Sequence, residues 1–320
     1  MLTEAAPLMQ VSAKDIAEKL GGKQKGNDKY LALCPAHGDK SPSLSIAKGR
    51  DQAVVFRCFA NCTQDSIIDA LRDLGLWPKK GDKIAPVKPS EKSSIDHEQE
   101  RLKAKSKALQ IWRQSQVVQE GDPVHAYLTE TRRLPLATIP SMIRCNHDLE
   151  YWVGGEPPVK VTSSPAMVAA IQNVQGDIVA VHRTYLTHTG EKLNLAKYGY
   201  EDAPVKKVLG KEINGAAIRL QEPSDTLIVA EGIETALAAH ILSGLPAWAA
   251  VSAGGLERIE IPAGVEHVII AVDNDAAGEK ASKALAGRLQ RLGKRVTMSY
   301  ASKIGAPEKG DFAELMRGAA

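Results

Sequence analysis

The chain has 320 residues, of which 43% are hydrophobic, 25% are charged and 4% are aromatic. This composition is that of a globular protein with two or three domains, and it excludes neither an enzyme nor a binding module. The formal net charge of +3 is too small to argue for nucleic-acid binding. The longest apolar runs, such as Val265 to Val272, are interrupted by charge, so we expect no membrane span, no signal peptide and a cytoplasmic location.

The N-terminal residues predict a small domain over residues 1–78. A short amphipathic helix is expected over 12–20, with Ser12 as its cap. Runs of strand-forming residues separated by turns then predict an antiparallel sheet, and helical spacing over 67–74 predicts a second helix that stops before Pro78. The expected strands are 28–35, 42–47 and 53–58.

Two further segments precede the C-terminal domain. Residues 79–107 are rich in Lys, Glu, Ser and Asp, and they predict a flexible linker whose last turns can be helical. Residues 108–224 mix helical and strand patterns and predict an α+β domain. Its expected helices are 109–119 and 124–129, and its expected strands are 166–172 and 177–186.

The C-terminal segment, residues 225–320, alternates strands with helices, which predicts an α/β domain with a parallel sheet. No G-x-x-x-x-G-K-[ST] sequence is present, so no ATP-driven motor is expected in this chain. The expected strands are 226–230, 246–251, 266–272 and 295–300, and the expected helices are 233–243 and 278–291.

Three of the four cysteines fall within the first 62 residues, which fits a reducing compartment better than a secreted disulfide framework. Cys34 and His37 lie on a turn that contains proline, and Cys58 and Cys62 lie on a second turn. Four such ligands can close a tetrahedron around Zn²⁺. Because the protein fills all four positions, we expect one structural zinc ion. Cys145 is expected to be a core or surface thiol.

Acidic residues follow two of the expected parallel strands. Glu231 comes after strand 226–230, and Asp273 and Asp275 come after strand 266–272. Because the carboxyl ends of parallel strands meet at the ligand crevice, the three acids are expected to share one site. Hard oxygen ligands select Mg²⁺ or Mn²⁺, and such a cation can bind phosphates.

Four segments of the sequence resemble the DnaG-type DNA primases. C-P-A-H-G-D-K-S-P-S-L-S-I (Cys34 to Ile46) and R-C-F-A-N-C (Arg57 to Cys62) are similar to the Cys-His-Cys-Cys zinc finger of that family. L-I-V-A-E-G-I-E-T-A-L (Leu227 to Leu237) and I-I-A-V-D-N-D-A-A-G (Ile269 to Gly278) are similar to its Toprim domain. The order of finger, basic domain and Toprim is that of a primase.

The resemblance implies synthesis of short RNA primers on single-stranded DNA from ribonucleoside triphosphates, by metal-dependent nucleotidyl transfer. It implies that Glu231 lies near the reacting phosphate, that Asp273 and Asp275 hold metal, and that Asp311 in K-G-D-F-A-E-L is a further metal ligand. The finger would engage template DNA, and a separate helicase is expected. Basic residues before the Toprim segment would bind nucleotide and template: Arg183, Lys197, Lys206, Lys207, Lys211 and Arg219.

Two departures from the bacterial pattern favour a phage or plasmid relative. Three residues rather than two separate Cys58 from Cys62, and Thr235 stands where primases often carry an acid. Glu234 either takes over that role or caps a helix N-terminus, where negative charge is favourable. The alternatives for the whole chain are a Toprim nuclease or topoisomerase-like enzyme, and a non-catalytic zinc-finger DNA-binding protein of replication.

The aromatic residues Phe56 and Phe59 flank the third cysteine of the finger. An aromatic face can stack on any unpaired base, so either ring could contact single-stranded DNA. The alternative is that one or both rings pack the finger.

Overall fold

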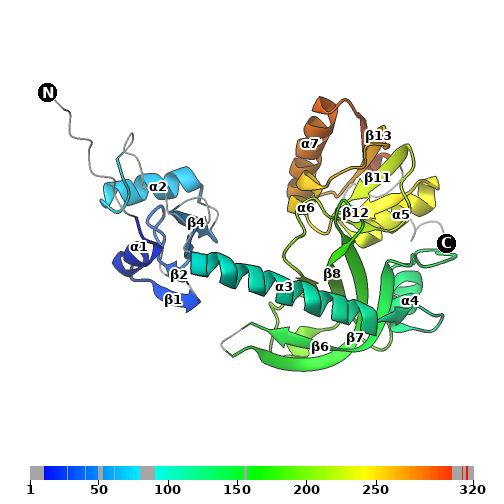
Figure 1. Cartoon of the computed structure of the whole chain (residues 1–320), viewed down its shortest axis with the longest axis horizontal. Coiled ribbons are helices and arrows are strands. Elements are labelled where there is room, and N and C mark those ends of the chain that lie inside the picture. The colour runs from blue at the N-terminus through cyan, green and yellow to red at the C-terminus, as the bar shows by residue number, and fades with distance from the viewer. Residues whose placement is uncertain are drawn as a thin grey trace. The chain divides into compact units, whose positions relative to one another are not determined.

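A computed structural model describes residues 11–26, 28–39, 41–49, 53–60, 62–79, 91–154 and 157–304, together with Phe312 and Leu315 (Figure 1). The chain divides into two compact units, Met1–Asp96 and His97–Ala320. Each unit has hydrophobic clusters of its own. None of the helices in the described part is long and apolar enough to cross a bilayer.

The first unit is a four-stranded antiparallel sheet in the order β1-β2-β3-β4, accompanied by two short helices. Each helix begins at a capping hydroxyl. Ser12 accepts a hydrogen bond from the backbone N–H of Asp15, and Thr63 accepts one from that of Ser66. The elements are α1 (Ala13–Lys19), β1 (Lys23–Gly26), β2 (Lys29–Ala32), β3 (Leu44–Lys48), β4 (Val54–Cys58) and α2 (Gln64–Asp73).

The core of the first unit is small and includes two thiols. Leu44 and Ile46 of β3 are fully buried, and Cys34 and Cys58 lie in the same cluster. So small a sheet buries little apolar surface, and domains of this kind usually need a metal or disulfides for stability. The cysteines therefore occupy the place where such a cross-link is needed.

The second unit begins within helix α3 (Glu91–Gln114), and this helix includes residues 91–107 of the segment predicted as a linker. An antiparallel sheet in the order β5-β6-β7-β8-β9 follows. Its elements are β5 (Gln116–Val117), α4 (Pro123–Ala126), the π-helix η1 (Tyr127–Thr131), β6 (Ile143–Val153), β7 (Val159–Gln172), β8 (Ile178–Tyr185), the 3₁₀ helix η2 (Leu195–Tyr198) and β9 (Lys206–Leu209).

A second sheet of this unit has the order β10-β12-β11-β13-β14, and all its neighbouring strands are parallel except β10 and β12. The α/β class with a parallel C-terminal sheet is thus confirmed, with an antiparallel edge strand added. The elements are β10 (Ile218–Arg219), β11 (Thr226–Ala230), α5 (Ile233–Ser243), β12 (Ala247–Ala249), α6 (Ala253–Arg258), β13 (His267–Val272), α7 (Ala276–Arg291), β14 (Arg295–Tyr300) and the 3₁₀ helix η3 (Ala301–Ile304).

Strand β11 lies between two layers of helices, as Figure 1 shows for α5 and α7. Successive side chains of a strand point to opposite faces, so Leu227 and Val229 join the cluster of α6 and α7, while Ile228 and Ala230 join the cluster of α5. Burial on both faces explains why the strand is a continuous apolar run. The run ends at its carboxyl edge, where the chain becomes acidic.

Some element boundaries were predicted wrongly. The helix expected over 109–119 ends at Gln114, because the chain then becomes strand β5 and pairs with β6. The strand expected over 246–251 ends at Ala249, and Val251 has a φ of 73°, which no strand accommodates. Strand β6, the longest partner of β7, was not predicted at all. The domain limits at residues 78, 107 and 224 stay predictions.

Candidate functional site

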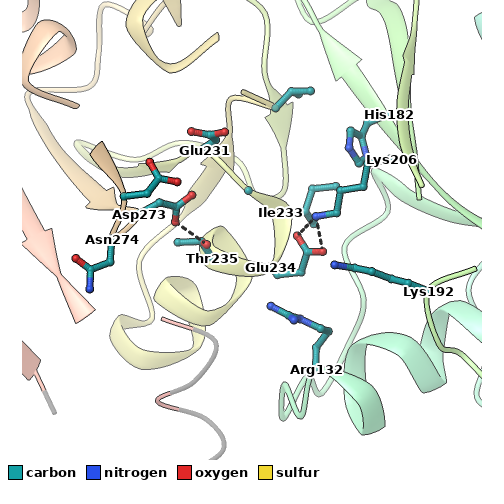
Figure 2. Close-up of a pocket in the computed structure, with 13 residues that line it drawn as sticks. Arg132, His182, Lys192, Lys206, Glu231, Ile233, Glu234, Thr235, Asp273 and Asn274 are labelled. Atoms are coloured by element: carbon teal, nitrogen blue, oxygen red, sulfur yellow. Dashed lines mark hydrogen bonds and ion pairs between the residues drawn. The ribbon is translucent and has the colours of Figure 1, made fainter. Parts of the chain in front are cut away.

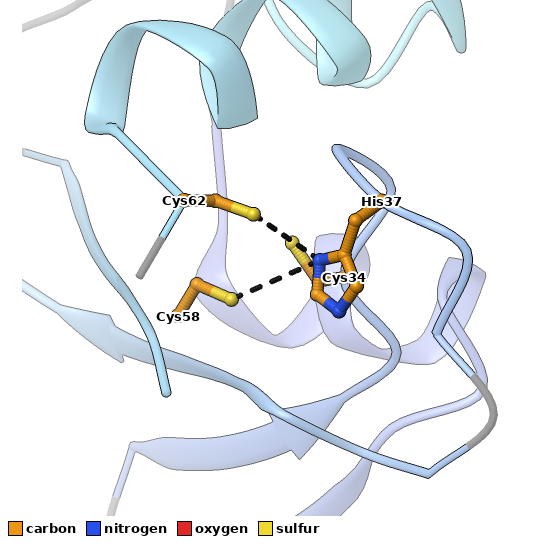
Figure 3. Close-up of side chains that lie close together, drawn as sticks. All are labelled: Cys34, His37, Cys58 and Cys62. Carbon is orange, nitrogen blue, oxygen red and sulfur yellow. Dashed lines mark hydrogen bonds between the residues drawn. The ribbon is translucent and has the colours of Figure 1, made fainter. Parts of the chain in front are cut away.

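The four predicted zinc ligands are brought together by two turns of the first unit (Figure 3). Cys34 and His37 follow β2, Cys58 ends β4, and Cys62 precedes α2. One donor atom of each lies within 4.8 Å of all the others. His37 Nδ1 lies 3.2 Å from Cys62 Sγ and 4.0 Å from Cys58 Sγ. Ligands of a tetrahedral zinc ion lie about 3.5–3.8 Å apart, so the residues fit a zinc ion.

A second layer of hydrogen bonds holds this cluster, and the sequence analysis missed it. Asp39 Oδ2 accepts hydrogen bonds from the Ser43 hydroxyl at 2.6 Å and from the backbone N–H of Cys34 at 2.8 Å. These bonds lower the pKa of Asp39. Its Oδ1 lies 3.5 Å from Nε2 of His37, which leaves Nδ1 facing the thiols. A carboxylate behind a ligating imidazole is common at zinc sites and fixes the ring.

The two aromatic rings beside Cys58 have different surroundings. Phe56 is 6% exposed and packs edge-on against Trp77, with ring centroids 5.3 Å apart. Phe59 is 60% exposed, and the guanidinium of Arg57 lies over its ring at 5.8 Å. Phe56 therefore packs the first unit, whereas Phe59 is available to a ligand.

The three predicted acids lie at adjacent strand ends in the second unit (Figure 2). Strands β11 and β13 are paired so that Ala230 lies opposite Ala271, and each strand is followed at its end by an acid, Glu231 and Asp273. Glu231, Asp273 and Asp275 line one pocket of about 410 Å³. Asp275 also caps α7, where its Oδ1 accepts a hydrogen bond from the backbone N–H of Gly278 at 2.7 Å. The predicted convergence of the three acids is what the structure shows.

The carboxylates interact but are spaced more widely than the zinc ligands. Burial and the charges of Asp273 and Asp275 raise the pKa of Glu231. Among the described residues, two groups of three or more possible ligands have all donor atoms within 4.8 Å of one another, and the three acids belong to neither. A Mg²⁺ ion keeps several waters and takes only one or two carboxylates together with substrate phosphates, so an open arrangement of hard oxygens fits such a cation.

Cationic side chains form the opposite wall of the same pocket. Arg132, Lys192 and Lys206 line it together with His182, and Figure 2 shows the first three directed toward the centre from the side away from Asp273. Burial lowers the pKa of His182 to about 4, with a further contribution from Lys206, so its imidazole is neutral near pH 7. The pocket is therefore acidic on one side and basic on the other.

Lys206 is held by a buried carboxylate. Its Nζ lies 2.8 Å from Oε1 and 3.1 Å from Oε2 of Glu234, and the Tyr127 hydroxyl donates to Oε1 at 2.6 Å. Burial alone would raise the pKa of Glu234, but the Lys206 ammonium and the bonds from Lys206 and Tyr127 hold it well below its ordinary value. The ion pair fixes where the lysine points.

The structure separates Glu234 from its neighbour Thr235. The Thr235 hydroxyl donates to Oδ1 of Asp273 at 3.0 Å, whereas Glu234 points toward Lys206 (Figure 2). Glu234 also lies in the first turn of α5, where its carboxylate accepts a hydrogen bond from its own backbone N–H. Glu234, which we expected either to replace the acid missing at Thr235 or to cap the helix, thus faces the basic wall of the pocket.

Of the six predicted basic residues, Lys206 lines the acidic pocket. Adjacent residues of a strand point to opposite faces, so Lys207 lies over the ring of Tyr151 at 3.9 Å and pairs across the sheet with Arg183. Lys211 binds Glu100. Arg219 donates to the carbonyls of Asn173 and Val174 and lies over the ring of Trp248. Lys197 is exposed on η2. Their binding roles stay predictions.

Two pocket residues, Arg132 and Lys192, were missed by the sequence analysis, and Asp311 lies outside the described residues. Arg132 follows the π-helix η1, an irregularity that is frequent at functional sites. Lys192 lies in the turn that brings the chain back beside Leu186. Neither position has a periodic signal, although the paired arginines at 132 and 133 were a hint.

Three family models match successive parts of the chain. Residues 8–75 match the CHC2 zinc finger, residues 102–220 match a domain of unknown function (DUF7146), and residues 226–319 match the Toprim domain. In addition, the chain is 32% identical over 140 residues to a DNA primase of Mycoplasma genitalium. The aligned stretch covers 40% of this chain and 22% of that protein. The chain thus combines a CHC2 zinc finger with a Toprim domain, and part of it is similar to a DNA primase.

Solved primase structures have lower sequence identity to this chain. The Aquifex aeolicus primase, with its zinc-binding and RNA polymerase domains, is 15% identical over 97% of this chain and 80% of that chain, with a TM-score of 0.44. The primase fragment of the bacteriophage T7 primase-helicase protein is 19% identical over 48% of this chain and 58% of that chain, with a TM-score of 0.35.

The two domain matches indicate a metal class for each cluster. The CHC2 match and the close approach of Cys34, His37, Cys58 and Cys62 support zinc, and the Toprim match implies a divalent metal at the acidic edge. The matched stretch spans only about a fifth of the curated primase.

Proposed function

We propose that the chain synthesises short RNA primers on single-stranded DNA by joining ribonucleoside triphosphates, with Mg²⁺ or Mn²⁺ as the catalytic cation. The observation that carries this proposal is the pocket with carboxylates on one wall and three cationic side chains on the other. A nucleoside triphosphate needs both walls, because its phosphates attract cationic groups while a cation between phosphate and carboxylate relieves their repulsion. The matches to the CHC2 zinc finger and the Toprim domain, and the similarity to a DNA primase, support the same function.

In this proposal the basic wall binds the triphosphate. Arg132 can form paired hydrogen bonds to phosphate oxygens, and Lys192 and Lys206 add point charges. Glu234 keeps the Lys206 ammonium at a fixed place, so little reorganisation is needed when the nucleotide enters. Tyr127 in turn holds Glu234.

The acidic wall would carry the chemistry. Asp273 and Asp275 would hold the divalent cation, which supplies neutralisation of phosphate charge when it is bound. Thr235 orients Asp273 through its hydroxyl. Glu231, whose pKa is raised by burial and by its acidic neighbours, is suited to accept the proton of the attacking 3′-hydroxyl. The 3′-oxygen then forms a bond to the α-phosphorus, and the bond to pyrophosphate breaks.

The first unit would hold the template. Its zinc ligands occupy all four positions, so this ion has a structural role and the exposed surface does the binding. Phe59 with Arg57 above its ring offers an aromatic and cationic platform for an unpaired base. Arg183, Lys197, Lys207, Lys211 and Arg219 are proposed as further contacts to nucleotide or template. We also propose that a separate helicase supplies the single strand and that the gene belongs to a mobile element.

A primer-synthesis assay tests the function. The full chain is given single-stranded DNA, labelled ribonucleotides and Mg²⁺ or Mn²⁺, alongside Asp273→Ala and Glu231→Ala. We expect labelled oligomers from the wild type and none from either variant. Asp202→Ala, an exposed acid that does not line the pocket, is the matched control and should synthesise normally. Undiminished synthesis in both pocket variants, or cleavage of the DNA without synthesis, would contradict the proposal.

A further inference from the structure

A second cluster of possible metal ligands lies in the second unit, outside the acidic pocket. Cys145 and His147 on β6 and Asp122 before α4 each have a donor atom within 4.8 Å of the other two. Cys145 Sγ lies 3.9 Å from His147 Nδ1, and Asp122 Oδ1 lies 3.5 Å from His147 Nε2. We propose that these three side chains bind a Zn²⁺ ion.

The fold brings the three residues together by three separate features. Residues two apart on a strand point to the same face, which puts Cys145 and His147 on one side of β6. The register of β6 against β7 shifts between Asn146 and Leu149, and such a bulge re-aims a side chain. Cys145 pairs with Gln116 of β5, and β5 leads within a few residues to Asp122.

Asp122 is already oriented toward the histidine. Its Oδ2 accepts a hydrogen bond from the backbone N–H of Gln119 at 2.7 Å, and its Oδ1 is the oxygen that faces His147. Its side chain is only 14% exposed. The carboxylate is therefore held beside the histidine by a backbone hydrogen bond.

The donor set selects the class of metal. A thiolate, an imidazole and a carboxylate together are typical ligands of Zn²⁺, whereas Mg²⁺ and Ca²⁺ prefer oxygens alone. Burial of the thiol does not prevent binding, because Cys34 of the finger is also buried, at 2% exposure. The His147 side chain is 48% exposed and provides a route from solvent. Three protein ligands leave a fourth position for water, so this ion should be lost more readily than the finger zinc.

A zinc ion here would join the start of α4 to β6. The chain from Asp122 continues through α4 into η1, which contributes Tyr127 to the Glu234 bond and leads directly to Arg132 in the pocket. Loss of the ion would loosen the segment that positions both residues. The site is thus expected to stabilise the basic wall without contacting a substrate.

Zinc content of the full chain tests this proposal. After saturation with zinc, removal of any affinity tag and gel filtration, we expect two zinc ions per wild-type chain and one in Cys145→Ser and His147→Gln. Because Cys145 is fully buried and its replacement can disturb folding, the exposed His147 is the decisive position. His188→Gln, an exposed histidine outside the cluster, is the control and should keep two.

A cobalt titration gives an independent measurement. With the finger occupied by zinc, Co²⁺ added to the wild type should produce a thiolate-to-cobalt absorption band that His147→Gln weakens and Cys145→Ser abolishes. One zinc per wild-type chain at saturation, or a second zinc and a cobalt band that survive both replacements, would overturn the proposal.

Discussion

The cysteine-histidine cluster and the acidic pocket hold their ligands in opposite ways. The cluster lies on turns of a small sheet, between residues 34 and 62, and two of its thiols are part of the hydrophobic core of that unit. The acids stand at the ends of β11 and β13, whose strands are buried between layers of helices. In the first unit the ligands complete the fold, whereas in the second the fold positions the ligands.

This difference determines what each metal would do. The finger has four soft or borderline ligands close together, and a filled tetrahedron leaves no position for a substrate. The acids are spread more widely, and Asp275 caps α7 while it also lines the pocket. Removing one metal should therefore unfold a unit, and removing the other should stop chemistry in a folded unit.

The largest expected effect is on the first unit when zinc is withdrawn. Structural zinc contributes about 10–16 kcal/mol to the folding of small zinc modules. We expect Cys58→Ser to lower the zinc content by one ion per chain and to remove the protection of β2, β3 and β4 from amide hydrogen exchange. The strands of the second unit should keep theirs. A first unit that stays protected without zinc would break the comparison.

Asp273→Asn should have the next largest effect, confined to activity. Loss of a metal carboxylate costs several kcal/mol of transition-state stabilisation, which corresponds to a fall in primer synthesis of about 100–1000-fold. The neutral side chain also relieves repulsion with Glu231, so the thermal unfolding temperature should not fall. Rate and unfolding temperature are measured on the same preparation. A variant that loses both equally would show that this acid supports the fold.

The ion pair of Lys206 and Glu234 should contribute to the stability of the second unit. Lys206→Met should lower the free energy of unfolding of that unit by about 2–3 kcal/mol, because Glu234 is left buried without its partner. The loss is smaller than for a fully buried pair, since the Lys206 side chain is 38% exposed. Urea denaturation of Lys206→Met, Glu234→Gln and the double variant gives the coupling energy. The double variant should be more stable than Lys206→Met.

The control for this cycle is the exposed pair of Lys211 and Glu100. Both side chains are about half exposed, so Lys211→Met should cost less than about 1 kcal/mol. Equal losses in the two lysine variants would mean that the Glu234 pair is no more important than a surface pair.

Because His182 is buried, we expect the second unit to lose stability at acidic pH. Its pKa is lowered from 6.5 to about 4, first by burial and then by Lys206, so the unfolded chain takes up the proton before the folded one. The stability linked to this residue is complete above pH 6.5 and is lost as the pH falls towards 4, with about 2 kcal/mol lost between pH 7 and pH 5. Urea denaturation of His182→Phe should lack this slope, whereas exposed His188→Gln should keep it.

The smallest expected effect concerns the orientation of Asp273. Thr235→Val removes one hydrogen bond, worth about 0.5–1.5 kcal/mol, so primer synthesis should fall by up to about 10-fold. Thr235→Ser keeps the donor and should retain most of the activity. If the two variants are equally active, the hydroxyl has no part in positioning the acid.

The sequence predicted helices, strands and site residues correctly where a single local rule determines the structure. Strands β11 and β14 and helix α5 have the predicted bounds, because buried parallel strands are continuous apolar runs and Gly244 ends the helix in a left-handed conformation. The zinc ligands were found by spacing and the acids by their place after strands. Each of these signals lies within a few residues of the chain.

The sequence failed where pairing is non-local. Strand β6 has mixed polarity and a bulge, and it exists because β7 lies beside it. The basic wall combines Arg132, Lys192 and Lys206 from three segments, and no periodicity links them. Without a predicted strand over 206–209, nothing indicated that Lys206 and Lys207 point to opposite faces. The described part of the chain also leaves the prediction for Asp311 open.

The most direct test of the central claim is whether product sequence follows template sequence. The wild-type chain is incubated with each of two complementary single-stranded DNAs, all four ribonucleotides and Mg²⁺ or Mn²⁺, and the RNA products are sequenced. If the acidic pocket joins nucleotides on a template held by the first unit, each DNA yields short RNAs complementary to itself, and Asp273→Asn yields far fewer of them. RNA of the same sequence from both DNAs, or no RNA from either, would contradict the account.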